Sequence, residues 1–183
     1  MIVFISGGCK NGKTKLGLDI ACLLSKESKK YYLATMVPFD SEDRERIENH
    51  KKERENLGFE TIEKAFDIGN IYLDKDGTYL LDALTSLLLN ETFEAKKKNL
   101  DINEVHKKII DDLKPLINNT KNLIIISDYI YSDGVIYNEY TESFKKNLAY
   151  IDKWVASKSN VVIERVVGIN HFIKGSLNIW KNI

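Results

Sequence analysis

Residues 1–14 read MIVFISGGCKNGKT. An apolar run of β type over 2–5 leads to Gly7, four further residues and then Gly12-Lys13-Thr14. This is the pattern G-x-x-x-x-G-K-[ST] of a phosphate-binding loop, and a helical pattern follows it at once. A glycine-rich turn is the alternative, but four fixed positions match by chance in roughly one chain in a hundred of this length. The stretch therefore predicts nucleotide binding between a buried strand and a helix.

The residue types of this loop suit the chemistry of phosphate binding. Its glycines let the backbone curl so that successive N–H groups point at phosphate oxygens. The following helix adds the positive end of its dipole. Lys13 is expected to reach the β- and γ-phosphates, and the Thr14 hydroxyl to bind Mg²⁺. The predicted nucleotide-binding loop consists of Gly7, Gly8, Cys9, Lys10, Asn11, Gly12, Lys13 and Thr14.

Length, charge and cysteine content narrow the class of protein. At 183 residues one domain over 1–183 is the default, with enough chain to bury a sizeable core. A net charge of zero gives no electrostatic case for nucleic acid or an anionic membrane. No apolar run reaches the roughly 18 residues that span a bilayer. Two cysteines, Cys9 and Cys22, do not suggest a disulfide framework. We expect them to be reduced thiols of a cytoplasmic protein.

Strand and helix patterns alternate along the chain, which predicts an α/β fold with a mostly parallel central sheet flanked by helices. With the phosphate loop, this is the RecA-like P-loop NTPase class. Residues 94–100 are expected to form a polar loop, and the tail from Gly168 to pack on the edge of the fold. Strands are expected over 2–5, 31–35, 59–62, 78–81, 123–126 and 161–167, and helices over 15–25, 40–57, 84–93, 101–116 and 142–156.

Two acidic residues follow apolar strands, and either of them could be the second Mg²⁺ ligand. Asp82 ends the run 78–81, and Asp128 follows the run 123–127. An apolar strand that closes on a carboxylate is typical of the second Mg²⁺-binding element of P-loop NTPases. Either residue can instead cap the next helix or turn. The sequence alone does not decide which of the two acids binds Mg²⁺.

Residues 40–57 form a predicted helix that is polar nearly all round, with Ile47 as its one large apolar residue before the end. Such a helix has little to bury and is expected to protrude from the core. Arg46, His50 and Arg54 recur at four-residue spacing and therefore share one face. This row of two arginines with a histidine between them suits the binding of a triphosphate. A solvated surface helix with Glu–Lys and Glu–Arg pairs is the alternative, which composition alone favours.

A loop rich in tyrosine follows the most apolar strand of the chain. Tyr129, Tyr131 and Tyr137 surround Gly134. Such a loop suits the covering of a flat ligand, and it equally suits a subunit contact.

Several motifs recur here in an order that resembles the bifunctional adenosylcobinamide kinase / adenosylcobinamide-phosphate guanylyltransferase family of cobalamin biosynthesis. The order and spacing hold over roughly the first half of the chain. The matching motifs are Gly7 to Thr14, Ala34-Thr35, Arg46-Ile47-x-x-His50-Lys51 with Arg54, Phe59 before Thr61-x-Glu63, and Leu80-Leu81-Asp82 with Asn90.

The second half of the chain departs from the family pattern in two places. Ser127-Asp128-Tyr129-Ile130 stands where the family has Asn-Glu-Val-Gly, and Tyr150-Ile151-Asp152-Lys153 stands where it has Gly-x-x-Asn-Gln. A late strand end, Val166-Val167-Gly168-Ile169, matches the family, as does Lys174.

The resemblance implies an enzyme with two activities. It would phosphorylate adenosylcobinamide with ATP or GTP, and then transfer GMP from GTP to the product to give adenosyl-GDP-cobinamide. The family's nucleophilic histidine, which forms a covalent GMP intermediate, falls on His50. Arg46, Lys51 and Arg54 would neutralise phosphate charge. The resemblance also implies Mg²⁺ as cofactor, a corrinoid substrate and a homotrimer, with no nucleic-acid partner.

The predicted site follows from the loop and the resemblance together. His50 and Lys13 are the expected catalytic residues, and Thr14 and Asp82 the expected Mg²⁺ ligands. A small-molecule kinase of the same fold and a non-catalytic nucleotide-binding paralogue are the alternative functions. Beyond the loop, the expected nucleotide-binding residues are Ala34, Thr35, Met36, Lys51, Lys52, Glu53, Arg54, Glu63 and Asp82.

Overall fold

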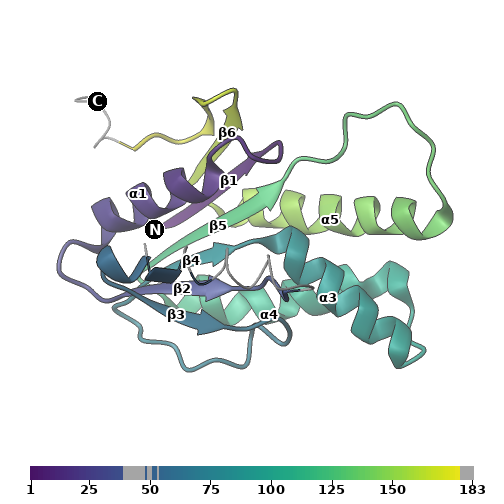
Figure 1. Ribbon diagram of the computed structural model, residues 1–183, viewed down its shortest axis with the longest axis horizontal. Helices are drawn as coiled ribbons and strands as arrows, with labels where there is room; N and C mark the ends of the chain where they lie inside the picture. Colours follow the sequence, from purple (N-terminus) through teal and green to yellow (C-terminus); the bar gives the residue numbers. More distant parts are fainter. Residues whose placement is uncertain (39–47, 49–50, 53, 178–183) are drawn as a thin grey trace.

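The computed structural model describes residues 1–38, 48, 51–52 and 54–177. In this part of the chain, seven strands form one sheet that is flanked by helices (Figure 1). The strands are β1 (Ile2–Gly7), β2 (Lys30–Ala34), β3 (Phe59–Glu63), β4 (Thr78–Asp82), β5 (Asn122–Asp128), β6 (Val161–Val166) and β7 (Ile169–Lys174). The helices are α1 (Lys13–Ser25), α3 (Leu84–Lys97), the short 3-10 helix η1 (Ile102–Glu104), α4 (Val105–Asn119) and α5 (Glu139–Lys158).

The strand order is β3-β2-β4-β5-β1-β6-β7, and every neighbouring pair is parallel except β6 and β7. Parallel strands end at the same edge of a sheet, where open α/β sheets bind ligands. The phosphate loop after β1 therefore shares an edge with the carboxyl ends of β2, β4 and β5. The register pairs Gly7 with Asp128 and Ala34 with Asp82, so both acids reach this edge.

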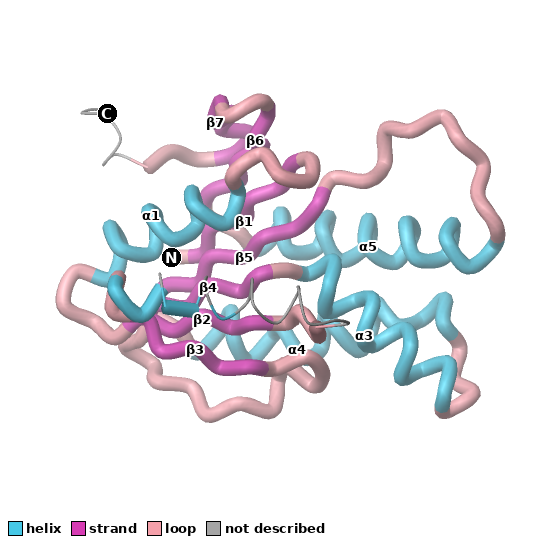
Figure 2. Tube along the Cα trace, viewed as in Figure 1, coloured by secondary structure: helices cyan, strands magenta, loops and turns pink. Residues whose placement is uncertain are grey.

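Each face of the sheet has its own apolar core, and Figure 2 shows the helices that cover the faces. In β1, Val3 and Ile5 pack on the side of α1, while Ile2 and Phe4 pack on the side of α3, α4 and α5. Successive side chains of a strand point to opposite faces, so a continuous apolar run indicates a strand that is buried on both. The apolar run at the start of the chain is therefore a central strand, as predicted.

Two elements differ from the sequence-based expectations. Helix α3 continues to Lys97, so the loop predicted for 94–100 is wrong for its first residues. Ala95 is buried there and Glu94 pairs with Lys97 over 2.6 Å, which sustains the last turn. The part of the tail over 169–174 lies on the edge of the fold as expected, and it does so as the antiparallel strand β7. None of the described helices is long and apolar enough to cross a membrane.

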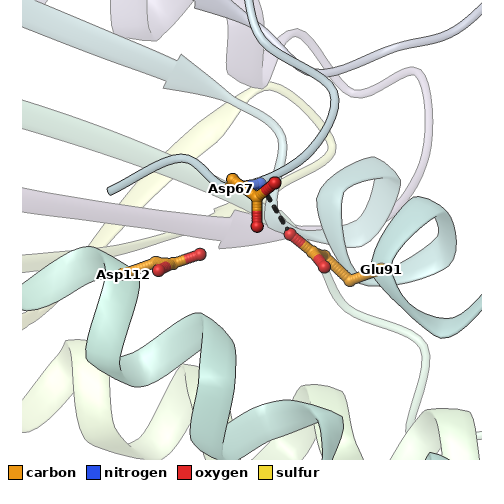
Figure 3. Close-up of side chains that lie close together, drawn as sticks. All are labelled: Asp67, Glu91 and Asp112. Carbon is orange, nitrogen blue, oxygen red and sulfur yellow. Dashed lines mark hydrogen bonds between the residues drawn. The ribbon is translucent and has the colours of Figure 1, made fainter. Parts of the chain in front are cut away.

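Three carboxylates gather where the connection between β3 and β4 meets α3 and α4 (Figure 3). Asp67 N–H donates to the buried Glu91 over 2.8 Å. The Lys108 ammonium lies 2.8 Å from Asp67, 2.6 Å from Glu91 and 2.8 Å from Asp112. Its hydrogen bond holds the pKa of Asp67 below the ordinary value. The cluster is therefore a set of ion pairs with Lys108 as its cation.

Candidate nucleotide-binding site

The loop between β1 and α1 has a backbone that only particular residues tolerate. Gly12 has a left-handed φ of 85° and Lys10 a φ of 57°. A side chain at Gly7 would clash with the carbonyl oxygen of Arg165 on the neighbouring β6. Asn11 donates its side-chain amide to the same carbonyl, and the Arg165 Nε donates to the Asn11 carbonyl over 3.3 Å. The loop is thus fastened to β6 on the side away from β5.

Lys13 begins α1 and its side chain is only 6% exposed. Its ammonium donates to the Gly8 carbonyl over 2.7 Å and pairs with Asp128 Oδ1 over 2.8 Å. A buried ammonium needs such partners because desolvation would otherwise be costly. The lysine is therefore held across the phosphate loop by the acid at the end of β5.

Asp82, at the end of β4, lies beside Thr14 rather than beside Lys13. The Thr14 hydroxyl donates to Asp82 Oδ2 over 2.7 Å, and the Tyr32 hydroxyl donates to the same oxygen over 2.7 Å. Burial, followed by the charge of Asp82, raises the pKa of Tyr32 far above its ordinary value, so this phenol stays a donor. Asp82 and Asp128, between which the sequence did not decide, thus have different partners in the site.

Thr14, Tyr32, Asp82 and Asp128 line a cavity of about 590 Å³ at the carboxyl ends of the strands, whereas Lys13 is not among the lining residues. Such a volume lies within the range of small-molecule sites. The cavity brings together seven of the predicted site residues, from five separate stretches of sequence. They are Thr14, Ala34, Met36, Lys51, Arg54, Glu63 and Asp82, and the lining also includes Tyr32, Pro38, Glu48, Thr61, Ala83, Ser86 and Asp128.

Arg54 is the most buried cation of the cavity after the phosphate loop. Its side chain is 6% exposed, and the guanidinium carbon lies 3.9 Å from the centre of the Tyr32 ring. The Arg54 Nε and the Thr61 hydroxyl are both buried without a hydrogen-bond partner among the described residues. Buried polar groups are nearly always paired, so both groups are expected to have partners beyond the described residues.

Not every predicted residue lines the cavity. Thr35 is fully buried, and its hydroxyl bonds to the backbone of Asp82 and Ala83. Asn90 donates to the Thr35 carbonyl over 2.7 Å. Thr35 therefore ties the ends of β2 and β4 together beneath the site. Lys52 is exposed away from the lining. His50, Glu53 and Arg46 lie outside the described residues, as does most of the helix predicted for 40–57.

Several lining residues were missed by the sequence reasoning, although a signal for two of them existed. Tyr32 is two residues before Ala34 in β2, and Thr61 is two residues before Glu63 in β3. Side chains two apart in a strand share a face, so the predicted residues already marked the face on which these lie. Ser86 and Arg165 carried no comparable signal, because their roles depend on how separate elements pack.

Comparisons with known proteins agree with this architecture. Among solved structures, the flagellar accessory protein FlaH from Methanocaldococcus jannaschii superposes with a TM-score of 0.50 at 12% identity, over 96% of this chain and 78% of that one. An ATP synthase subunit, NeqB, from Nanoarcheaum equitans gives a TM-score of 0.55 at 13% identity, over 89% of this chain and 45% of that one. These likenesses concern the fold, which is that of the RecA-like P-loop class.

At the level of sequence, no curated protein gives a significant match. The family profile described as cobinamide kinase / cobinamide phosphate guanyltransferase matches residues 3–173, which is nearly the whole chain. The match extends through β5, α5 and β6, where the sequence departs most from the family motifs. The chain belongs to the cobinamide kinase / cobinamide phosphate guanyltransferase family.

Proposed function

We propose that this chain carries out both reactions of its family: it phosphorylates cobinamide with ATP or GTP, and it transfers GMP from GTP to the resulting phosphate through His50. The observation that carries the proposal is the cavity itself. It is lined by Thr14 and Asp82 beside the phosphate loop, and by Lys51 and Arg54 from the segment that contains the histidine motif. A nucleotide in this cavity meets the groups needed for its phosphates.

In the kinase step, Lys13 exchanges its contact with Asp128 for the β- and γ-phosphates of the nucleotide. The hydroxyl oxygen of Thr14 and the carboxylate of Asp82 form the hard oxygen donor set that Mg²⁺ prefers, so these two residues hold the ion. When bound, Mg²⁺ neutralises charge on the phosphates. The acceptor hydroxyl attacks the γ-phosphorus, the new P–O bond forms as the bond to the diphosphate oxygen breaks, and the hydroxyl proton is lost.

In the second step, an imidazole nitrogen of His50 attacks the α-phosphorus of GTP and diphosphate leaves. An oxygen of cobinamide phosphate then attacks the same phosphorus, which releases the histidine and forms the GDP-cobinamide linkage. Lys51 and Arg54 are the cations of the cavity that neutralise phosphate charge in both displacements. The role of His50 rests on its motif, because this residue lies outside the described part of the chain.

The deciding experiment is incubation of the protein with α-labelled GTP and Mg²⁺, followed by denaturing electrophoresis and peptide mass spectrometry. We expect an acid-labile label on His50, absent from His50→Ala, and its discharge when cobinamide phosphate is added. Retained label in His50→Ala would overturn the role of this residue. No label at all, with GTP binding intact, would favour a kinase that lacks the second activity.

We also propose that the chain assembles as a homotrimer. The support is strand β7, whose Ile169, Phe172 and Ile173 side chains are 59%, 40% and 66% exposed at the edge of the sheet. Exposed apolar edge strands are normally covered in assembled proteins. Light scattering should give about three times the chain mass of 21.0 kDa, and Ile173→Lys should lower it. A mass of 21.0 kDa for the unmodified protein would refute the assembly.

A further inference from the structure

The two stretches that depart from the family motifs meet in space. Tyr131, in the loop 129–138 that follows β5, donates its hydroxyl to Asp152 Oδ2 on α5 over 2.8 Å. Ser127, at the end of β5, is fully buried beside the same carboxylate. The stretch 150–153 thus supplies the carboxylate, while Ser127 of the other departing stretch and Tyr131, the residue just after that stretch, place hydroxyls beside it. They form a single unit, the Tyr131–Asp152 clamp.

The clamp is unusual because its carboxylate is buried with no cation paired to it among the described residues. Asp152 is 8% exposed, and its Oδ1 has no hydrogen-bond partner among the described residues. Burial, which outweighs the hydroxyls of Tyr131 and Ser127, raises the pKa of Asp152 to about 6, and the charge of Asp128 acts in the same direction. A residue that breaks the rules of burial without local compensation commonly marks a functional site. The clamp therefore calls for a role beyond packing.

That role follows from the segment which the clamp holds. Figure 1 shows the loop 129–138, in green, leaving the end of β5 and extending beyond the edge of the sheet before α5 begins. Tyr129 N–H at its start donates to the Gly7 carbonyl over 2.9 Å, so the loop adjoins the phosphate loop. The rings of Tyr129 and Tyr131 meet edge to face at 5.3 Å. The clamp thereby sets where the loop stands relative to the cavity.

Four exposed side chains of this loop are largely apolar, and they stand beside the polar Ser132, Asp133 and Asn138. Ile136 is 93% exposed, Val135 55%, Tyr129 43% and Tyr137 39%. Apolar side chains on a loop that begins at the phosphate loop suit a large, flat and largely apolar ligand. The corrin macrocycle of a cobinamide acceptor is such a ligand. A nucleotide is not, because it carries a polar base, a ribose and charged phosphates.

We propose that Asp152 is a positioning residue for the corrinoid acceptor: through Tyr131 it fixes the loop 129–138 beside Asp128, where the apolar side chains of the loop contact the macrocycle. This inference rests on the proposed function, since it takes the acceptor to be a corrinoid. It assigns to the region around the two departures one shared task, the recognition of the acceptor. Nucleotide binding is left to the residues that match the family motifs in the first half of the chain.

The test measures corrinoid and GTP binding separately on the full chain. Equilibrium dialysis with cobinamide, followed by its visible absorbance, gives one Kd, and dialysis with GTP gives the other. Tyr131→Phe and Asp152→Ala should each raise the cobinamide Kd about tenfold or more, the range expected for a buried hydrogen bond to a charged group. The double variant should bind no more weakly than either single one. Asp152→Asn should bind within about twofold of the natural protein, because its amide oxygen still accepts from Tyr131.

A matched control exists at the opposite end of the strands. Tyr31, at the start of β2, donates its hydroxyl to Asp74 over 3.2 Å, so Tyr31→Phe removes the same kind of bond far from the cavity. It should leave both Kd values unchanged. Cobinamide binding that is unaffected in Tyr131→Phe and Asp152→Ala would overturn the proposal. A parallel loss of GTP binding would also overturn it, because a merely structural role weakens both ligands.

Labelling of His50 by α-labelled GTP requires no corrinoid, and this keeps the two proposals distinguishable. Labelled His50 with unchanged cobinamide binding in the clamp variants overturns only the positioning role. Absent label with weakened cobinamide binding in these variants overturns guanylyl transfer and supports the positioning role. A natural protein that binds no cobinamide overturns the positioning role whatever the labelling.

Discussion

The Thr14 hydroxyl donates a 2.7 Å hydrogen bond to Asp82, a residue 68 positions later in the chain. The bond forms because β1 and β4 are parallel strands that end at the same edge of the sheet. Tyr32 donates to the same oxygen from β2. The carboxylate is therefore oriented by two hydroxyls before any ligand arrives, which is the kind of preorganisation that a metal-assisted reaction needs.

Asp82→Asn should slow both nucleotide-dependent reactions about a hundredfold and raise the Mg²⁺ concentration needed for half-maximal rate. The amide keeps an acceptor for the Thr14 and Tyr32 hydroxyls, but it removes the charge that holds the ion, which is worth several kcal/mol. Rates measured against Mg²⁺ concentration check this. Asp76→Asn, in the exposed turn before β4, is the control and should behave as the natural protein. An unchanged Mg²⁺ dependence in Asp82→Asn would transfer the role to Asp128.

Arg54→Ala should weaken GTP binding about tenfold while leaving the protein folded. The guanidinium stacks on Tyr32 and Arg54 lines the cavity, so it contributes positive charge to a phosphate ligand. Equilibrium dialysis with GTP measures the effect. Lys114→Ala removes an exposed cation from α4 and should leave the Kd unchanged. Equal affinities for Arg54→Ala and Lys114→Ala would exclude Arg54 from the nucleotide site.

Gly17→Val should destabilise the fold by about 1–3 kcal/mol, because α1 lies too close to the sheet for a larger residue. A Cβ at this glycine would lie 2.9 Å from Leu80 Cδ1 and 3.1 Å from Ile126 Cδ1. Urea unfolding at neutral pH measures the loss. Gly134→Val is the control, since nothing lies within 4 Å of a Cβ there. Equal stability of the two variants would show that α1 shifts freely on the sheet.

Lys108→Met should lower the free energy of unfolding at neutral pH by about 2 kcal/mol or more, because it leaves the buried Glu91 with two carboxylate neighbours and no cation. Lys108 holds the pKa of Asp67 below 3.8, so this stabilisation is present above that pH and fades as the pH falls through the lowered value. The difference between the variant and the natural protein should therefore shrink in acid.

The control for this prediction is Lys114→Met on the same helix, which breaks an exposed ion pair of 2.6 Å with Asp111. Exposed pairs contribute little, so its stability should stay within about 0.5 kcal/mol of the natural value. Urea unfolding at pH 7 and at about pH 2, below the lowered pKa window of Asp67, distinguishes the cases. A pH-independent loss in Lys108→Met would show that the side chain acts through packing rather than charge.

Asp152→Asn should stabilise the protein at neutral pH and change little near pH 4. Burial raises the pKa of Asp152 to about 6 from an ordinary value of 3.8, so the folded state retains a proton that the unfolded state has lost between these values. Stability contributed by this group is therefore present in acid and is lost as the pH rises through about 6. The gain above pH 6 is on the order of 2 kcal/mol. Urea unfolding from pH 4 to 8 measures it, and a constant difference across this range would contradict the raised pKa.

The sequence by itself determined the phosphate loop, the alternation of strands and helices and the family. Each of these depends on residues that are near neighbours in the chain: the spacing of Gly7 and Gly12-Lys13-Thr14, or the apolar run of β1. Local backbone preference and side-chain periodicity carry such signals directly. The same reasoning placed Asp82 and Asp128 at strand ends, and the common edge of parallel strands made both plausible partners of the loop.

Only the tertiary structure decided which groups meet at that edge. Strand order put Asp82 against Thr14 and Asp128 against Lys13, and packing turned Thr35 into a tie between strands rather than part of the lining. It also joined Tyr131 to Asp152 from two stretches that showed no relation in the sequence. Contacts between distant segments depend on the whole set of packed elements, and a reading of neighbouring residues does not contain that information.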